Sequence, residues 1–285
     1  MRQLEEIIHL IFIGAISVIV RSPCLFGDFV HDDLPTILWN QDVITNKSNW
    51  TSLFSHDIVG RDMVKTRTNF SHDFYRPLTV LSYRLNYSLL GNASSNFHLV
   101  NTMVQLINCW LVYFVVKKME QSSIAALFTA SIFSVHPVLT DTVCGLTNRG
   151  SLLTGFFTLI TLLVYQKNTI LAIFAICLGI LAKEEGILII LLIISVQIIK
   201  RERISHTLFV YGSFLALVLS LRHNYFSKPE VFEEDNPIAF IESSFLRRLN
   251  FNYILSFSFS LMIWPQWMCY NWSMNCIGKP NSCLV

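Results

Sequence analysis

The sequence predicts an all-α, polytopic membrane protein with about seven or eight transmembrane helices and a long first loop. Hydrophobic residues make up 53% of the 285 residues, charged residues make up 14%, and the mean hydropathy is +0.50. Soluble domains carry about 25% charged residues. The apolar residues fall in runs of about 14 to 20, close to the length with which a helix crosses about 30 Å of hydrocarbon. We therefore expect a bundle of helices in a bilayer.

Eight apolar segments are the expected helices, and polar stretches separate them. In chain order they are Leu4–Val20, Phe97–Val116, Ile124–Val135, Leu152–Tyr165, Ile170–Ala182, Ile187–Ile199, Leu208–Leu221 and Leu246–Trp264. One membrane domain over residues 1–285 is expected, divided into a first span (4–20), a first luminal loop (21–96), further spans (97–221), a second luminal loop (222–245), and a last span or re-entrant segment with a tail (246–285). A re-entrant last segment leaves the tail luminal, whereas eight full spans place it in the cytosol.

Basic residues between the spans predict the orientation. Lys117-Lys118, Lys167 and Lys200-Arg201-Glu202-Arg203 follow alternate pairs of spans. The excess of Lys and Arg in cytoplasmic loops places all three in the cytosol. The first loop is then luminal.

The first loop carries five Asn-X-Ser/Thr sequons, which are usable only in the lumen. They are at Asn46, Asn49, Asn69, Asn86 and Asn92. The alternative for the first span is a cleaved signal peptide, but Met1–Glu6 is not a basic leader and Arg21-Ser22-Pro23 is a poor cleavage site. We therefore expect an uncleaved membrane anchor.

Motifs of soluble enzymes are missing from the sequence. The seven cysteines include no CxxC pair, and no Walker loop, GxGxxG, HExxH or GxSxG motif occurs. No metal site is expected, and a net charge of +2 without a basic aromatic patch gives no indication of nucleic-acid binding. Cys24 and Cys144 both map to the lumen and can form a disulfide, although nothing in the sequence requires one.

An adjacent pair of carboxylates, Asp32 and Asp33, lies just past the first span. Carboxylates at a membrane face cost free energy unless they are paired or functional. The alternative is that they cap a helix N-terminus. A carboxylate pair in a luminal, glycosylatable loop is typical of a membrane-embedded sugar transferase.

Three further luminal turns carry polar groups to the same face. They are Ser71–Leu78 with Arg76, His136–Asp141 with Asn148-Arg149, and Lys183–Gly186. Each has a structural alternative, since Arg76 can cap or snorkel, His136-Pro137 can end a helix, and Lys183-Glu184 can be an interfacial ion pair. Together the turns supply bases and cations in one layer, which suits transfer from an anionic lipid phosphate.

The order of these motifs resembles the transmembrane and tetratricopeptide-repeat-containing (TMTC) family of protein O-mannosyltransferases, which look like members of the GT-C superfamily. The matching stretches run nearly the length of the chain: Phe29–Asp33, Tyr75–Leu78, Arg84–Asn86, Phe97-His98 with Asn101, His136-Pro137, Thr140–Val143 with Arg149, Lys183–Gly186, Asp235–Pro237, Arg248-Leu249 and Tyr270–Met274. The resemblance implies a GT-C-type bundle.

Several positions depart from the family pattern. Its Tyr-Asp-Asp reads His31-Asp32-Asp33, its Thr-Glu reads Thr140-Asp141, its Gly-Arg-Ala-Asp reads Asn148–Ser151, and its Asp-Trp-Ser reads Asn271–Ser273. The last two changes lose an acid. The family's helical 34-residue repeats are also missing from this sequence, so a truncated member is expected.

The resemblance implies transfer of mannose from dolichyl-phosphate mannose to Ser or Thr of luminal proteins, in the membrane of the endoplasmic reticulum. Asp32 is then the expected general base, and Asp33 orients it or binds the acceptor. Arg76, Arg149 and Lys183 are expected to stabilise the leaving phosphate, with His136, Asp141 and Glu184 in support. The expected partners are the lipid-linked donor, luminal acceptor proteins and membrane lipid. No cofactor or metal is required.

Three other functions compete with this one. A transporter predicts charges near mid-span and an internal repeat, neither of which the sequence contains. A non-catalytic scaffold or truncated pseudoenzyme keeps the fold and binds partners. A GT-C transferase with a different acceptor, such as a lipid-linked glycan, uses the same residues.

Overall fold

In the computed structural model of the chain, the described residues are 2–44, 49–62, 74–201, 205–225, 237–266 and 268. Helices, turns and irregular segments account for them, and no strand occurs in these ranges. The chain divides into two units, Met1–Lys228 and Pro229–Val285, which are described separately.

All eight expected apolar segments are helical. The first unit contains α1 (Arg2–Arg21), α2 (Pro77–Leu90), α3 (Ser94–Glu120), α4 (Ser123–Val135), α5 (Leu139–Cys144), α6 (Arg149–Val164), α7 (Thr169–Ala182), α8 (Leu188–Ile199) and α9 (Ser205–Tyr225). Short 3₁₀ or π turns join them: η1 (Ser22–Phe26), η2 (Leu34–Leu38), η3 (Ser52–Phe54), η4 (Leu146–Asn148) and η5 (Glu184–Ile187). The second unit contains η6 (Pro237–Phe240) and α10 (Ser244–Ile263).

Local sequence explains where the helices begin and end. The Ser122 hydroxyl accepts a hydrogen bond from Ala125 N at 3.2 Å and caps α4, which ends at Val135, directly before His136-Pro137. The residue before a proline disfavours helical geometry, so the helix stops there. Helix α5 therefore begins as a separate helix after Pro137.

Among the described residues, two helices are long and apolar enough to cross a membrane, namely Gln3–Phe26, which covers α1 from Gln3 onward together with η1, and α3. Within the described residues, the apolar helices α4 and α7 and the segment Phe209–Ser220 of α9 are shorter. Large apolar side chains of α1, including Leu4, Ile8 and Ile11, are more than half exposed. Such exposure suits contact with lipid. Seven or eight crossings remain a prediction.

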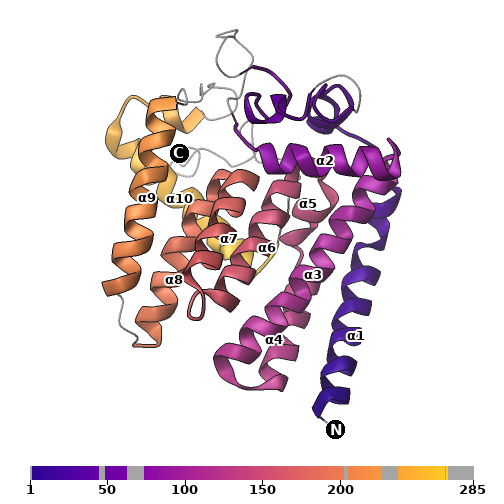
Figure 1. Cartoon of the computed structure of the whole chain (residues 1–285), viewed down its shortest axis with the longest axis vertical. Coiled ribbons are helices and arrows are strands. Elements are labelled where there is room, and N and C mark those ends of the chain that lie inside the picture. Colours follow the sequence, from indigo (N-terminus) through magenta and orange to yellow (C-terminus); the bar gives the residue numbers. More distant parts are fainter. Residues whose placement is uncertain are drawn as a thin grey trace, which may run out of the picture. The chain divides into compact units, whose positions relative to one another are not determined.

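Helices α1, α3 and α4 pack together on one side of the first unit, and α3 and α7 both pack against α6 (Figure 1). Ile13, Tyr113, Ala126 and Ala130 form the core of the α1/α3/α4 group. Alanines at the contacts let the backbones approach closely, as in other membrane bundles. A second core joins α7, α8 and α9.

The expected first loop is a folded cap that includes a helix. Ile37, Val43 and Leu53 pack against Tyr83 of α2 and Phe97 of α3. Helix α2 lies across the ends of α3, α6 and α7 (Figure 1). The expectation of one long loop over residues 21–96 missed α2, because its interior alternates apolar residues with Thr, Ser, Arg and Asn and offers no apolar run. Pro77 starts the helix and Gly91, at φ +83°, ends it.

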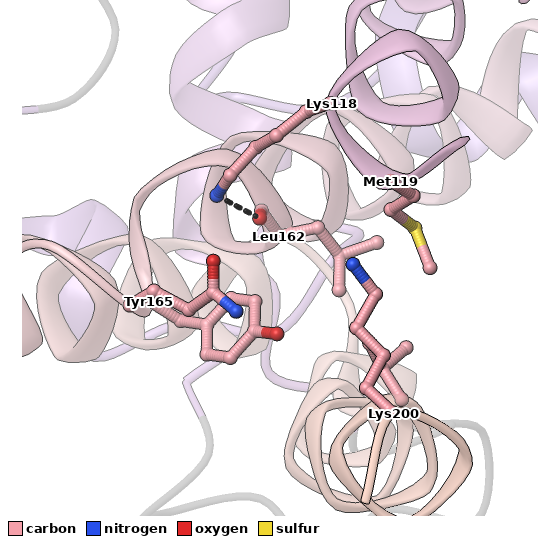
Figure 2. Close-up of a pocket in the computed structure, with 7 residues that line it drawn as sticks. Lys118, Met119, Leu162, Tyr165 and Lys200 are labelled. Carbon is pink, nitrogen blue, oxygen red and sulfur yellow. Dashed lines mark hydrogen bonds between the residues drawn. The ribbon is translucent and has the colours of Figure 1, made fainter. Parts of the chain in front are cut away.

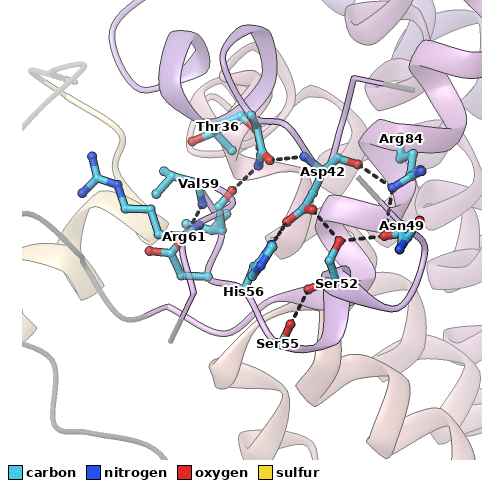
Figure 3. A network of polar contacts seen from close by, with 12 residues as sticks. Thr36, Asp42, Asn49, Ser52, Ser55, His56, Val59, Arg61 and Arg84 are labelled. Carbon is cyan, nitrogen blue, oxygen red and sulfur yellow. Dashed lines mark hydrogen bonds and ion pairs between the residues drawn. The ribbon is translucent and has the colours of Figure 1, made fainter. Parts of the chain in front are cut away.

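A buried carboxylate holds the cap together (Figure 3). Asp42 Oδ1 accepts from the Ser52 hydroxyl at 2.9 Å, and its Oδ2 lies 2.7 Å from His56 Nδ1. Arg84 of α2 donates to the Asp42 carbonyl at 3.3 Å, and its guanidinium lies 4.4 Å from the centre of the Trp50 ring. These contacts attach the part of the cap that precedes α2 to this helix.

A disulfide joins Cys24 of η1 to Cys144 at the end of α5, 120 residues later. The bond therefore connects the segment after α1 to the turn before α6. Disulfides persist in oxidising compartments such as the lumen of the endoplasmic reticulum. The Cys24–Cys144 disulfide, which the sequence allowed but did not require, is therefore formed.

The cap gives the sequons different accessibilities. Asn49 and Asn92 are exposed, whereas Asn86 is 4% exposed, and its side chain is enclosed by the fold. Asn46 and Asn69 lie outside the described residues. The expectation of a glycan at Asn86 is therefore corrected, because its buried amide nitrogen has no room for a sugar.

Glycosylation of the chain in microsomes tests the cap and the orientation together. We expect Asn49→Gln and Asn92→Gln each to remove one unit of endoglycosidase-sensitive mass from the parent, and Asn86→Gln to remove none, since only the first two amides are exposed. The readout is the gel shift before and after endoglycosidase. Loss of a glycan in Asn86→Gln contradicts the buried position, and a wholly unglycosylated chain contradicts the luminal orientation.

Candidate functional site

Polar residues from four chain segments meet at the end of the first unit that carries the cap. We call Asp32, Asp33, Arg76, Asp141, Lys183 and Glu184 the polar cluster. They come from the loop after η1, the residue before α2, helix α5 and the α7–α8 turn. Hydrogen bonds from Arg76 to Glu184 and from Thr147 N to Asp33 bring residues more than 100 positions apart into contact.

The two adjacent aspartates have different environments. Asp33 is 3% exposed, and its carboxylate accepts from Val30 N and from Thr147 N, each at 3.1 Å. Asp32 is exposed, and its carboxylate makes no hydrogen bond or ion pair to the described part of the chain. Asp33 thus anchors the loop to η4, while Asp32 faces outward.

The helix-capping alternative is wrong for Asp33. Although Asp33 directly precedes η2, its side chain makes no capping bond to that turn and reaches instead to Val30 and Thr147. Burial raises the pKa of the Asp33 carboxyl above its usual range, and the two backbone N–H donors oppose part of that increase. The neighbouring Asp32 adds to it. The contact to Thr147 was invisible in the sequence because the donor is a backbone amide.

Arg149 lies beneath the polar cluster and is fully buried. Its guanidinium donates to Asn101 Oδ1 at 2.6 Å, Asn86 Oδ1 at 2.9 Å, Phe97 O at 3.0 Å and Ser82 O at 3.3 Å. A buried charge is tolerated only when acceptors surround it. Arg149 was expected to contact the donor phosphate. Its buried contacts instead give it a structural role, in which it joins α6 to α2 and α3.

An aromatic ring completes the surroundings of Arg149. The guanidinium lies 4.6 Å from the centre of the Tyr83 ring, whose hydroxyl donates to Leu146 O at 2.6 Å. Sequence reasoning missed Tyr83, although its position one helical turn before Asn86 places both residues on one face of α2. Tyr83 is identified once residues 77–90 are recognised as a helix.

Arg76 is an accessible cation of the cluster, held by an acid from a distant turn. Its Nε donates to Glu184 Oε2 at 3.0 Å, and its guanidinium lies 4.6 Å from the centre of the Phe74 ring. The other oxygen of Glu184, Oε1, is buried and has no hydrogen-bond partner among the described residues. Such an oxygen accepts an incoming hydroxyl or amide at little cost.

Lys183 is the second cation. Its Nζ donates to the Ser151 hydroxyl at 2.9 Å and lies 3.1 Å from Glu185 Oε1. Lys183 also acts on Asp141: burial raises the pKa of the Asp141 carboxyl, while the Asn148 amide and the Lys183 charge oppose that increase. The alternative of an interfacial Lys183–Glu184 pair is wrong, because Lys183 pairs with Glu185 and Glu184 pairs with Arg76.

His136 lies at the turn between α4 and α5 and has a structural position. Its carbonyl accepts from Arg21 Nη2 at 2.9 Å, and Arg21 also donates to the Thr140 hydroxyl at 2.6 Å. His136 Nδ1 accepts from Val138 N at 3.3 Å. The buried Arg21, which the sequence analysis did not single out, thereby fixes the end of α1 to this turn.

Two close backbone contacts hold the turns of the cluster together. A Cβ on Gly186 would lie 2.4 Å from the carbonyl carbon of Gly179, and a Cβ on Gly150 would lie 2.9 Å from Ala182 O. Only glycine permits this packing of η5 and α6 against the end of α7.

Within the described ranges, no three His, Cys, Asp or Glu side chains are grouped to bind a metal ion.

Two family models match parts of the chain. A family model described as dolichyl-phosphate-mannose-protein mannosyltransferase matches residues 77–226, and one described as protein O-mannosyl-transferase TMTC, DUF1736 matches residues 225–283. No solved structure matches the chain.

Curated relatives extend over almost the whole chain. A Caenorhabditis elegans protein O-mannosyl-transferase, F38B6.6, is 31% identical over 96% of this chain and 40% of its own length. Human TMTC4 is 28% identical over 93% of this chain and 43% of its own length, and Drosophila melanogaster Tmtc1 is 28% identical over 93% and 34%. The chain thus spans about two fifths of the length of the curated relatives it matches. The chain belongs to the TMTC family of protein O-mannosyl-transferases.

Proposed function

We propose that this chain forms the catalytic membrane part of a protein O-mannosyltransferase, which moves mannose from dolichyl-phosphate mannose to Ser or Thr hydroxyls of luminal proteins. The observation that carries the proposal is the exposed Asp32 carboxylate beside the anchored Asp33, in a chain of the mannosyl-transferase family. No cofactor takes part, because the sugar is already activated by its phosphate.

The proposed reaction is a single displacement. The acceptor hydroxyl loses its proton to Asp32 as its oxygen attacks the anomeric carbon, and the bond from that carbon to the phosphate oxygen breaks. Dolichyl phosphate leaves with the bonding electrons, and the configuration of the sugar inverts. Atoms and charge balance without a further reactant.

Arg76 and Lys183 are the proposed partners of the leaving phosphate. Their side chains are 15% and 19% exposed, and each is already paired with a carboxylate, Glu184 and Glu185 respectively. Cationic groups aimed at the position of developing negative charge stabilise the transition state. A bound phosphate competes with these carboxylates for the two cations.

The proposed setting is the membrane of the endoplasmic reticulum, with a GT-C-type bundle of seven or eight crossings and the polar cluster in the lumen. Three observations support this: the Cys24–Cys144 disulfide suits an oxidising compartment, the exposed sequons lie at the same end of the first unit as the cluster, and the basic joints lie at the other ends of the helices. The donor is then reached from the luminal leaflet.

Substitution of the two aspartates separates chemistry from structure. We expect Asp32→Asn to lower mannose transfer by about 10²–10⁴-fold, the usual effect of losing a positioned base, with an unchanged unfolding temperature. We expect Asp33→Asn to lower the free energy of unfolding by about 1–3 kcal/mol, because an amide group turns one N–H toward Val30 N or Thr147 N. The measurements are transfer to a Ser/Thr peptide by purified protein and thermal unfolding in detergent.

Asp28→Asn is the matched control, since Asp28 is an exposed aspartate of the same loop. Its transfer rate should equal that of the parent. Parental transfer in Asp32→Asn rules out Asp32 as the base.

Substitution of Arg76 tests donor binding. We expect Arg76→Ala to raise the KM for dolichyl-phosphate mannose about ten-fold or more, and Arg76→Lys to restore part of the loss, because lysine lacks the forked geometry that matches phosphate oxygens. The acceptor KM should not change. The matched control is Arg61→Ala, which removes an exposed arginine of the cap. An unchanged donor KM in Arg76→Ala contradicts this role and leaves Arg76 as a partner of Glu184 alone.

A further inference from the structure

A small pocket lies between the C-terminal ends of α3, α6 and α8 (Figure 2). The polar cluster lies at the opposite end of the first unit. The residues that line the pocket are Lys118, Met119, Leu162, Tyr165, Gln166, Val196 and Lys200. Among the described residues that line the pocket, two are lysines and none is an acid, so the described lining carries a net positive charge.

The two lysines hold different positions. Lys118 donates to Leu163 O at 2.9 Å and to Leu162 O at 3.4 Å, so its charge offsets the negative end of the α6 dipole, and its Nζ lies 5.6 Å from the centre of the Tyr165 ring. Lys200 is exposed and forms no ion pair with the described residues. Figure 2 shows its ammonium group directed toward Leu162 and Met119. Lys200 is thus the cation that an external anion meets.

The size of the pocket limits what can enter. Its cavity volume is 10 Å³, room for a group the size of one water molecule or one phosphate oxygen. Leu162, Met119 and Val196 form the apolar part of the lining, and Gln166 and Tyr165 carry the neutral polar groups. An anion therefore inserts one oxygen and keeps the rest of its charge outside, against Lys200.

The position of the pocket along α3 indicates which anion is near. Helix α3 has 27 residues, and at 1.5 Å per residue it is about 40 Å long, enough to cross the hydrocarbon and reach both headgroup layers. Lys118 is two residues from the end of α3, where a helix of this length reaches a headgroup layer. The other charged residues described at this end are Lys117, which pairs with Glu6 at 2.6 Å, together with the exposed Glu5, Glu120, Lys167 and Arg201.

We propose that this pocket binds the phosphate group of an anionic membrane phospholipid, with Lys200 and Lys118 as the cationic contacts and Gln166 beside them. The lipid then joins the C-terminal ends of α3, α6 and α8, at the end of the first unit opposite the polar cluster. This site is separate from the donor site and does not depend on the proposed transferase activity. Basic pockets between membrane helices bind phospholipid headgroups in this manner.

Native mass spectrometry of the detergent-solubilised chain tests the proposal, with dioctanoyl phosphatidic acid as the probe. We expect Lys200→Ala and Gln166→Glu each to weaken binding by about five-fold or more, since one removes a cation and the other adds an anion. Lys200→Arg should bind like the parent. The matched control is Lys167→Ala, an exposed lysine at the same end that does not line the pocket, which should lose less than about two-fold.

Three results overturn the proposal. Equal losses in Lys200→Ala and Lys167→Ala assign the binding to diffuse surface charge. Equal binding of dioctanoylglycerol, which has the same chains without a phosphate, assigns it to apolar contact. Equal affinity for inorganic phosphate assigns the pocket to a free anion rather than a lipid.

Discussion

The buried guanidinium of Arg149 is the constraint on which the rest of the polar end depends. A charge in this position is stable only while Asn86, Asn101 and two backbone carbonyls surround it, so α2, α3 and the start of α6 must meet there. Residues close to Arg149 in the sequence are held in place together with it. Thr147 holds Asp33 and Ser151 holds Lys183, so the residues around Arg149 connect the first loop to the α7–α8 turn.

This arrangement separates a supporting residue, Asp33, from the proposed base, Asp32, within one adjacent pair. Asp33 is bound from two sides and cannot move without breaking the link to η4, whereas Asp32 next to it is exposed. Catalytic groups work best when neighbouring contacts fix their position in advance. The cations Arg76 and Lys183 follow the same pattern, since Glu184 and Ser151 orient them before any ligand binds.

The sequence predicted the apolar helices well, because long apolar runs leave no other structure in lipid. It missed α2, whose burial is shared between the cap and α3 and leaves no apolar run. It placed Asp32, Asp33, Arg76 and Lys183 at one end correctly, but it assigned Arg149 to a ligand and Asn86 to a glycan. Residue type alone does not distinguish a buried arginine from a phosphate-binding one. The distinction depends on acceptors supplied by Ser82 and Phe97 carbonyls, which no side-chain pattern reveals.

Thermal unfolding of Arg149→Lys, measured in detergent without donor, tests most directly whether Arg149 supports the fold. Lysine keeps the charge but cannot donate to four acceptors in the same plane, so we expect the free energy of unfolding to fall by about 2–4 kcal/mol. Arg76→Lys is the matched control, because its partly exposed ion pair contributes less, and it should unfold close to the parental temperature. A parental unfolding temperature for Arg149→Lys, combined with weaker donor binding, would contradict the structural role and return Arg149 to the donor site.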